Sequence, residues 1–407
     1  MSATQVTVGL DVGTTKVCAV VAEVDNGDVT SILGVGACPC DGLERGVVVN
    51  LEATTQAVTD ALRSASQSAG ISIKNVMAGI AGEHVRSFQS TGVIGVSRKD
   101  REIHSDDLQR VLEHARAYPI PGDRQLLHCL PRDFTVDEQR GIRDPLGMSG
   151  VRLEAEVHIV TVHSTAVQNL LRAITRAGVQ VDALILESLA SARAVVEDDE
   201  AALGVLLLDI GGGTTDVAVY ERGSVRHTAV LGYGGKAITN DIAVVLHTSL
   251  DQAERLKLEH GAAIAARVAP HEEVEVAGVG GREPKRVTTQ VVASIIEPRA
   301  EEIFALARAE VERVLDPSLL KAGVVLTGGT AALRGLTELA ERTLGLPARV
   351  GVPTGLKGVT DWTADPRMSA AVGLVLYGAA EGRTRRVGTN LLDRVRRPFR
   401  EWFREHL

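Results

Sequence analysis

Residues 209–216 read Asp-Ile-Gly-Gly-Gly-Thr-Thr-Asp, a run of small residues between two apolar segments. The flanking segments, 204–209 and 216–221, have the composition of β-strands, so the run predicts a turn that joins them. In such a turn successive backbone N–H groups point toward one place, and glycine permits positive φ and close approach of a ligand. The run therefore predicts a concave site for an anion such as phosphate.

A shorter version of this pattern lies near the start of the chain. Residues 11–16 read Asp-Val-Gly-Thr-Thr-Lys, between predicted strands at 5–11 and 16–24. In both copies an Asp-x-Gly turn ends in Thr-Thr, and a third predicted strand follows, at 29–36 and at 224–231. This internal repeat predicts two similar α/β lobes that face one another.

The carboxylates in these turns indicate a metal ion. Asp11 and Asp209 stand at strand ends beside the predicted anion sites, where bare negative charge would repel phosphate. Mg²⁺ between carboxylates and phosphates removes the repulsion, because it prefers oxygen ligands and keeps waters that the aspartates can hold. Lys16 would supply a point charge to the phosphates. The alternative is a pair of glycine-rich hairpin turns with capping aspartates. The candidate phosphate-binding residues are Asp11, Gly13, Thr14, Thr15, Lys16, Asp209, Gly211, Gly212, Gly213, Thr214 and Thr215.

A third small turn, Gly328-Gly329-Thr330, follows the apolar segment 324–326. Taken alone, it would be a connection between a strand and a helix. Beside the other two turns it is a candidate for the sugar and adenine side of a nucleotide site.

The segment 85–163 has a different rhythm from its surroundings. Its short predicted strands lie at 92–96, 125–130, 134–136 and 151–162, and its one predicted helix, 106–117, has Ser105 as N-cap. This mixture predicts an inserted α+β subdomain. Helices elsewhere are expected at 54–69, 238–247, 250–260, 290–314 and 369–380.

The composition is typical of a folded soluble protein with more than one domain. The chain has 407 residues, of which 44% are hydrophobic and 24% charged, and its net charge of −8 argues against nucleic acid as a partner. No apolar run approaches the roughly 18 residues that span a bilayer, and no charged leader precedes the first predicted strand. We expect the four cysteines to be reduced, as is usual in the cytosol.

The C-terminal end differs from this acidic body. Eight arginines and three acidic residues lie between Arg383 and Leu407. Within 391–407, apolar residues recur at steps of three and four with arginines between them, which predicts an amphipathic helix in a lipid interface. Pro398 either kinks this helix or begins it, and the alternative is a terminal helix packed on its own body. The candidate membrane residues are Leu392, Val395, Phe399, Trp402 and Phe403.

Together these motifs resemble the actin-like ATPase superfamily, which includes actin, heat-shock chaperones and sugar kinases. Its phosphate motifs are similar to 11–16 and 209–216, its adenosine motif to 325–330, and its two connecting helices to 185–196 and 369–378. Within it the chain resembles the FtsA family of bacterial division proteins, on Gly-Ile-Arg-Asp-Pro-Leu-Gly-Met-Ser-Gly at 141–150 and Arg-Leu-Glu-Ala-Glu-Val-His at 152–158. The resemblance covers nearly the whole chain. It implies an α/β, actin-like (ribonuclease H-like) two-lobed ATPase fold with an inserted α+β subdomain in the first lobe.

The resemblance also implies a division of the chain into subdomains. The first core subdomain (1A) would comprise 1–84, 164–197 and 364–382, with the inserted subdomain (1C) at 85–163. The second core subdomain (2A) would comprise 198–231 and 315–363, with a smaller subdomain (2B) at 232–314. A linker at 383–390 and the membrane-targeting helix at 391–407 would complete the chain.

Individual roles follow only from the resemblance. Glu254 and Lys257 match a pair that flanks ribose and adenine, although a surface ion pair is the simpler alternative, and Gly235 belongs to a matching Gly-Gly. Glu187 matches the position that orients the attacking water, while weak or absent ATPase activity is implied for the family. Arg299 matches a helix near the docking site of the FtsZ tail, with a solvated helix face as the alternative.

The implied function is that of an ATP- and Mg²⁺-binding division protein at the cytoplasmic face of the cell membrane, at the division site. It would form head-to-tail filaments, bind the FtsZ C-terminal tail, hold the FtsZ ring to lipid through its terminal helix, and contact later division proteins through the inserted subdomain. The alternatives are a pilus-assembly actin-like ATPase and a small-molecule kinase of the same fold.

Overall fold

The computed structural model describes residues 5–97, 100–280, 282–359 and 364–387 and contains two five-stranded sheets of the same topology. In each sheet an antiparallel three-stranded meander continues into two parallel strands, so the expected repeat is confirmed. The first sheet has the order β11-β6-β1-β2-β3, formed by Gln180–Leu186, Asn75–Ile80, Gln5–Val12, Lys16–Asp25 and Asp28–Pro39. The second has the order β14-β13-β12-β17-β18, formed by Ser224–Leu231, Thr215–Glu221, Val205–Ile210, Gly323–Thr327 and Ala348–Val350.

The hairpins of the two meanders use the same turn chemistry. Asn26 and Gly27 have φ of 52° and 88°, and Arg222 and Gly223 have φ of 53° and 76°. Two consecutive residues with positive φ are typical of the type I′ turn, whose twist matches that of the flanking strands.

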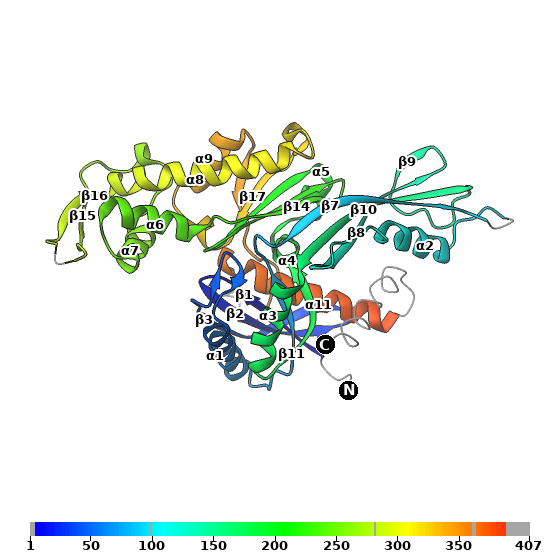
Figure 1. Cartoon of the computed structure of the whole chain (residues 1–407), viewed down its shortest axis with the longest axis horizontal. Helices are drawn as coiled ribbons and strands as arrows, with labels where there is room; N and C mark the ends of the chain where they lie inside the picture. Colours follow the sequence, from blue (N-terminus) through cyan, green and yellow to red (C-terminus); the bar gives the residue numbers. More distant parts are fainter. Residues whose placement is uncertain (1–4, 98–99, 281, 360–363, 388–407) are drawn as a thin grey trace.

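Alternating side chains of the first sheet bury two different helix faces. Val17, Ala19 and Val21 pack with α1 (Leu51–Ala69) and α3 (Ser164–Arg176). Cys18 and Val20 point the other way, onto α11 (Ser369–Val387). In the second sheet, alternate residues face α8 (Thr289–Glu312) and α9 (Leu336–Leu344) on one side and α4 (Glu187–Val195) on the other. Since α4 and α11 also pack on each other, these two helices lie between the lobes (Figure 1).

The segment inserted into the first lobe forms its own antiparallel sheet of order β7-β10-β8-β9 with one helix, α2 (Ser105–Arg116). Its strands are Arg86–Gly95, Arg152–His163, Arg124–Val136 and Gln139–Ile142. The predicted strands 125–130 and 134–136 are a single strand, β8. The predicted N-cap Ser105 is wrong: the cap is His104, whose backbone N–H donates to Asp107 at 3.1 Å.

The inserted subdomain is hydrogen-bonded to the second lobe along β14. Ser87 donates to the Thr228 carbonyl at 2.6 Å, and His158 Nε2 lies 2.9 Å from Thr228 Oγ1. Arg132 is only 12% exposed and bridges Glu156 of the insert (2.7 Å) and Glu221 of β13 (3.3 Å). The insert is thus covalently part of one lobe and bonded to the other.

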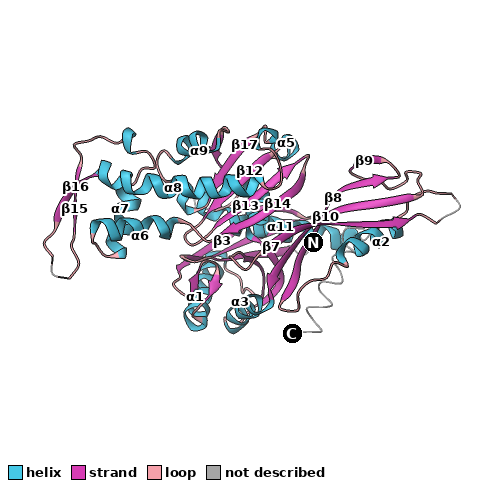
Figure 2. Cartoon of the chain, turned by 45° about the horizontal axis from the view of Figure 1, so that its top comes forward, coloured by secondary structure: helices cyan, strands magenta, loops and turns pink. Residues whose placement is uncertain are grey.

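A smaller helical subdomain extends from the second lobe, at the end of the molecule opposite the insert (Figures 1 and 2). It contains α6 (Gly235–Leu246), α7 (Leu250–His260), the hairpin β15 (Glu273–Val276) and β16 (Lys285–Thr288), and much of α8. The other elements among the described residues are β4 (Leu43–Glu44), β5 (Val47–Val48), α5 (Asp198–Leu203) and the short 3₁₀ turns η1 (Ala265–Arg267), η2 (Pro317–Leu319), η3 (Gly329–Ala332) and η4 (Pro366–Met368).

The C-terminal helix α11 runs to Val387, past the expected end at 380 and into the expected linker 383–390. The predicted membrane residues, from Leu392 to Phe403, lie outside the described residues. Across the part of the chain that the structure describes, no helix has the length and apolarity needed to cross a bilayer.

Candidate functional site: two glycine-threonine turns over a carboxylate cluster

The two predicted phosphate turns have the same backbone geometry. Gly13 N–H donates to the Lys16 carbonyl at 3.0 Å, and Gly211 N–H donates to the Thr214 carbonyl at 2.9 Å. Lys16 and Thr214 are therefore equivalent, and Thr14-Thr15 corresponds to Gly212-Gly213. The two Thr-Thr pairs therefore stand two positions apart when the turns are superposed on these hydrogen bonds.

The turns meet across the gap between the lobes. A Cβ atom on Gly212 would lie 2.3 Å from Thr15 Cγ2, and one on Gly213 would lie 2.5 Å from Thr14 Oγ1. Threonine side chains on one turn thus require glycine on the other.

Several backbone N–H groups at this junction have no hydrogen-bond acceptor within the described protein. Among the described residues, the N–H groups of Thr14, Thr15, Gly212 and Gly213 donate to no protein acceptor. The carbonyl groups of the second turn are instead satisfied from the outside, since Gly211 accepts from Gly235 N–H (2.9 Å) and Gly212 from Lys236 N–H (2.7 Å). Unpaired N–H groups gathered at one place are what an anion needs.

Four carboxylates lie beneath the turns. Asp11, Asp209 and Asp216 are 7%, 9% and 3% exposed, and Glu187 is half-buried. Sequence reasoning did not select Asp216 as a site residue, yet it is the cross-strand partner of Asp209, so both side chains lie on one face of the sheet. Alternation along β13 could have found it.

Burial raises the pKa of each of these carboxylates, and neighbouring carboxylates raise those of Glu187, Asp209 and Asp216 further. Burial, and then the charges of Asp11, Asp216 and Asp209, raises the pKa of Glu187 well above its ordinary value. Burial, and then Asp209, does the same to the pKa of Asp216. Burial also raises the pKa of Asp11, and it raises that of Asp209 to about 6 against an opposing hydrogen bond from Ser191.

This cluster fits a divalent cation. Like charges held this close are unfavourable unless a cation lies among them. One oxygen of Asp216, Oδ1, is buried without a protein donor among the described residues. Lys16 contributes one positive charge near Asp11 and Asp209, and its ammonium donates to the Arg367 carbonyl. The donor set is all oxygen, as Mg²⁺ prefers.

The predicted sugar and adenine residues converge beside the second turn. Thr330 Oγ1 donates to the Gly211 carbonyl at 3.1 Å. Lys257 Nζ contacts Glu254 (2.8 Å) and the Gly235 carbonyl (3.0 Å). Lys257 is mostly buried in this contact, so the pair is more than a solvated ion pair on one helix. Gly328 has φ of 84°, and a Cβ there would lie 2.3 Å from Asp209 Oδ1; Gly329 begins η3.

Two predicted residues have structural partners. Thr215 Oγ1 is buried and donates to the Tyr233 carbonyl at 2.8 Å, so its hydroxyl is not directed at the turn junction. Arg299 forms a two-point hydrogen bond from α8 to Asp241 of α6, at 2.7 and 3.1 Å, and also contacts Glu302.

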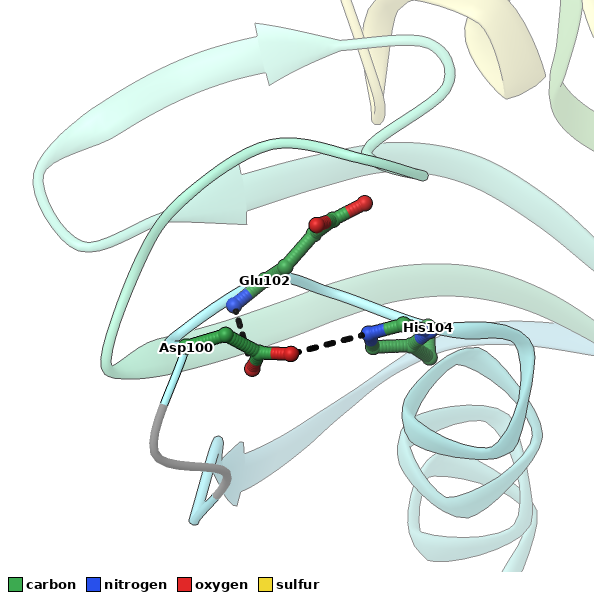
Figure 3. Close-up of side chains that lie close together, drawn as sticks. All are labelled: Asp100, Glu102 and His104. Carbon is green, nitrogen blue, oxygen red and sulfur yellow. Dashed lines mark hydrogen bonds and ion pairs between the residues drawn. The ribbon is translucent and has the colours of Figure 1, made fainter.

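A separate group of metal-ligand side chains lies in the insert. Asp100 accepts from Glu102 N–H at 3.2 Å and pairs with His104 Nε2 at 3.6 Å (Figure 3). Asp100 and Glu102 are exposed. These contacts belong to the segment that leads into α2, and they explain why the three side chains lie together.

Sequence comparison identifies related proteins over most of the chain. The profile described as Cell division protein FtsA matches 206–373, and that described as SHS2 domain inserted in FTSA matches 82–161. The chain is 46% identical over 371 residues to the Cell division protein FtsA of Pseudomonas aeruginosa, which covers 91% of this chain and 88% of that protein. It is 39% identical over 378 residues to that of Escherichia coli (strain K12), with 91% and 90% covered.

Solved structures share the fold at low sequence identity. The PilM-PilN type IV pilus biogenesis complex aligns with a TM-score of 0.66 at 19% identity, over 92% of this chain and 98% of that chain. MreB5 of Spiroplasma citri bound to ADP aligns with a TM-score of 0.57 at 14% identity, over 95% and 99%. These likenesses show an actin-like fold, as the sequence predicted.

Proposed function

Because the chain belongs to the FtsA family of bacterial cell-division proteins, we propose that it binds ATP with Mg²⁺ between its lobes and holds the FtsZ ring on the membrane. The observation that carries the nucleotide part is the junction of the two turns, with its unpaired N–H groups above buried carboxylates.

Different residues bind different parts of the nucleotide. The N–H groups of Thr14, Thr15, Gly212 and Gly213 hold phosphate oxygens, and Lys16 adds charge. Asp11 and Asp209 hold Mg²⁺ through its waters, and the metal, when bound, neutralises phosphate charge. Gly235, Glu254, Lys257 and Thr330 border the sugar and base. The structures of Spiroplasma citri MreB5 bound to ADP and to AMPPNP have a similar fold, which supports a nucleotide as the ligand.

Turnover by this site is weak or absent in our proposal. A carboxyl group takes a proton from water only when it is ionised, and burial together with the surrounding acids raises the pKa of Glu187. Glu187 therefore orients water poorly as a base until a cation offsets Asp11, Asp209 and Asp216.

The division role requires attachments at several surfaces. The predicted helix at 391–407 would lie in the lipid of the cytoplasmic face at the division site, and subunits would stack head to tail so that many weak helices bind by avidity. The smaller subdomain, near Arg299, captures the FtsZ C-terminal tail, and the inserted subdomain contacts later division proteins. The FtsA relatives over nine-tenths of the chain favour this role over pilus assembly or small-molecule phosphorylation.

Nucleotide binding is tested by titrating the purified full chain with a fluorescent ATP analogue, with Mg²⁺ and with EDTA. We expect binding that Mg²⁺ strengthens and that Asp11→Asn weakens by about tenfold, equal to 1.4 kcal/mol. Asp60→Asn, on the exposed side of α1, is the matched control. Failure of the unmodified protein to bind ATP with Mg²⁺ contradicts the proposal.

Membrane attachment is tested by sedimentation with vesicles that contain anionic lipid. The full chain should pellet, and a variant without 391–407 should stay in the supernatant, with ATP or with ADP. Trp402→Glu should behave like the deletion because it places charge on the apolar side, whereas Glu401→Gln should pellet normally. Equal pelleting of the full and shortened chains would contradict membrane attachment through residues 391–407.

A further inference from the structure

Lys236, the second residue of α6, touches both phosphate turns at once. Its backbone N–H donates to the Gly212 carbonyl at 2.7 Å in the second turn. Its side-chain ammonium donates to the Thr14 carbonyl at 3.1 Å in the first turn. Nothing in the sequence motifs singled out this residue.

The direction of these hydrogen bonds fixes the orientation of the N–H groups in the same peptides. A trans peptide is planar, with its C=O and N–H pointing to opposite sides, and every peptide bond in the described residues is trans. A donor that holds the Thr14 carbonyl therefore turns Thr15 N–H the opposite way, and a donor that holds the Gly212 carbonyl does the same for Gly213 N–H. Both N–H groups are among those that find no acceptor in the described protein.

We propose that Lys236 is a positioning residue for the phosphates: it fixes one peptide in each turn so that the N–H groups of Thr15 and Gly213 face a common anion. The inference rests on the proposed nucleotide site and assigns it a residue of the second lobe that acts on the first. The ammonium reaches Thr14 only when the lobes are close, so Lys236 makes the full donor set available only in the closed arrangement.

The alternative is that Lys236 merely stabilises the fold. Its side chain is exposed, and an exposed contact of this kind adds little to folding free energy. A positioning role predicts that Lys236→Met leaves the melting temperature of the nucleotide-free protein unchanged but reduces the increase that ATP with Mg²⁺ produces.

The experiment compares Lys236→Met, Lys236→Arg and the control Lys321→Met, each as the full chain titrated with ATP and Mg²⁺. We expect Lys236→Met to weaken the affinity about tenfold, Lys236→Arg to recover most of it, and Lys321→Met, on the exposed far side of the second lobe, to match the unmodified protein.

Two results would overturn the proposal. One is unchanged affinity of Lys236→Met, and the other is a loss that comes with a lowered melting temperature of the nucleotide-free protein and is not recovered by Arg. If the unmodified protein does not bind ATP at all, the nucleotide site itself fails, which is a distinct outcome.

Discussion

Gly212 lies against Thr15 so closely that even a methyl group there must displace the facing turn. We expect Gly212→Ala to weaken binding of ATP with Mg²⁺ at least tenfold and to cost about 1–3 kcal/mol of folding free energy, as overpacking does. Nucleotide titration and thermal melting measure the two effects. The matched control is Gly122→Ala, since a Cβ at Gly122 meets no atom within 4 Å. Equal behaviour of the two variants would contradict the tight junction.

The buried carboxyl of Asp209 predicts a pH dependence. Its pKa in the folded protein is about 6, above the ordinary value of 3.8, so folding favours the protonated form. Its contribution to stability is therefore greatest at low pH and is lost as pH rises through about 6. In EDTA, Asp209→Asn should raise the melting temperature at pH 7.5 and change it little at pH 4. A uniform effect at both pH values would argue against a buried charge.

At the residue scale, motifs located the turns but not their neighbours. Asp11 and Asp209 were predictable because each sits in a local motif. Ser191 and Lys236 act on the same site from α4 and α6, and their approach depends on how the elements pack. Sequence spacing carries no measure of that packing.

Elements were predicted best where the signal was local, as in the three strands of each meander and in α7. The predicted break in β8 comprised residues 131–133, yet the strand continues there through a register shift opposite Glu156 and Val157. Pro131 is tolerated because β9 pairs only with Phe134 and Val136, which leaves the edge beside the proline open. The expected end of α11 at 380 ignored that Glu381 to Val387 contain no helix-breaking proline.

Helices α6 and α8 are tied by Arg299, and this element-level contact separates two roles for that residue. If Arg299 binds the FtsZ tail directly, Arg299→Ala should weaken the affinity for a tail peptide, whereas Asp241→Asn should retain or strengthen it by releasing the guanidinium. If Arg299 only holds the two helices together, both variants should weaken the affinity for the peptide to the same extent. Peptide titration distinguishes the two, and denaturant unfolding should give each variant a loss of roughly 1 kcal/mol.

For the whole molecule, the decisive contact is the seam between the insert and β14. Arg132 is almost buried there with acids from both sides. Arg132→Met should leave those carboxylates short of a partner and cost about 1–3 kcal/mol at the seam. Amide hydrogen exchange should then speed up in β7 and β14, because local opening becomes easier. Arg110→Met is the control, since Arg110 pairs with Asp107 inside the insert alone.

No acceleration at the seam, or the same acceleration in both variants, would show that Arg132 does not join the two parts.

Because the insert is part of the first lobe and is bonded to the second, it restrains the angle between the two lobes. The lobes cannot change their angle unless the Thr228 and Arg132 contacts slide or break. A protein that binds the insert in only one of two lobe angles must therefore alter the affinity for a ligand between the phosphate turns. That ligand must in turn alter the affinity of the insert for the protein by the same factor. A protein bound to the insert would thus respond to what lies between the phosphate turns without contacting it.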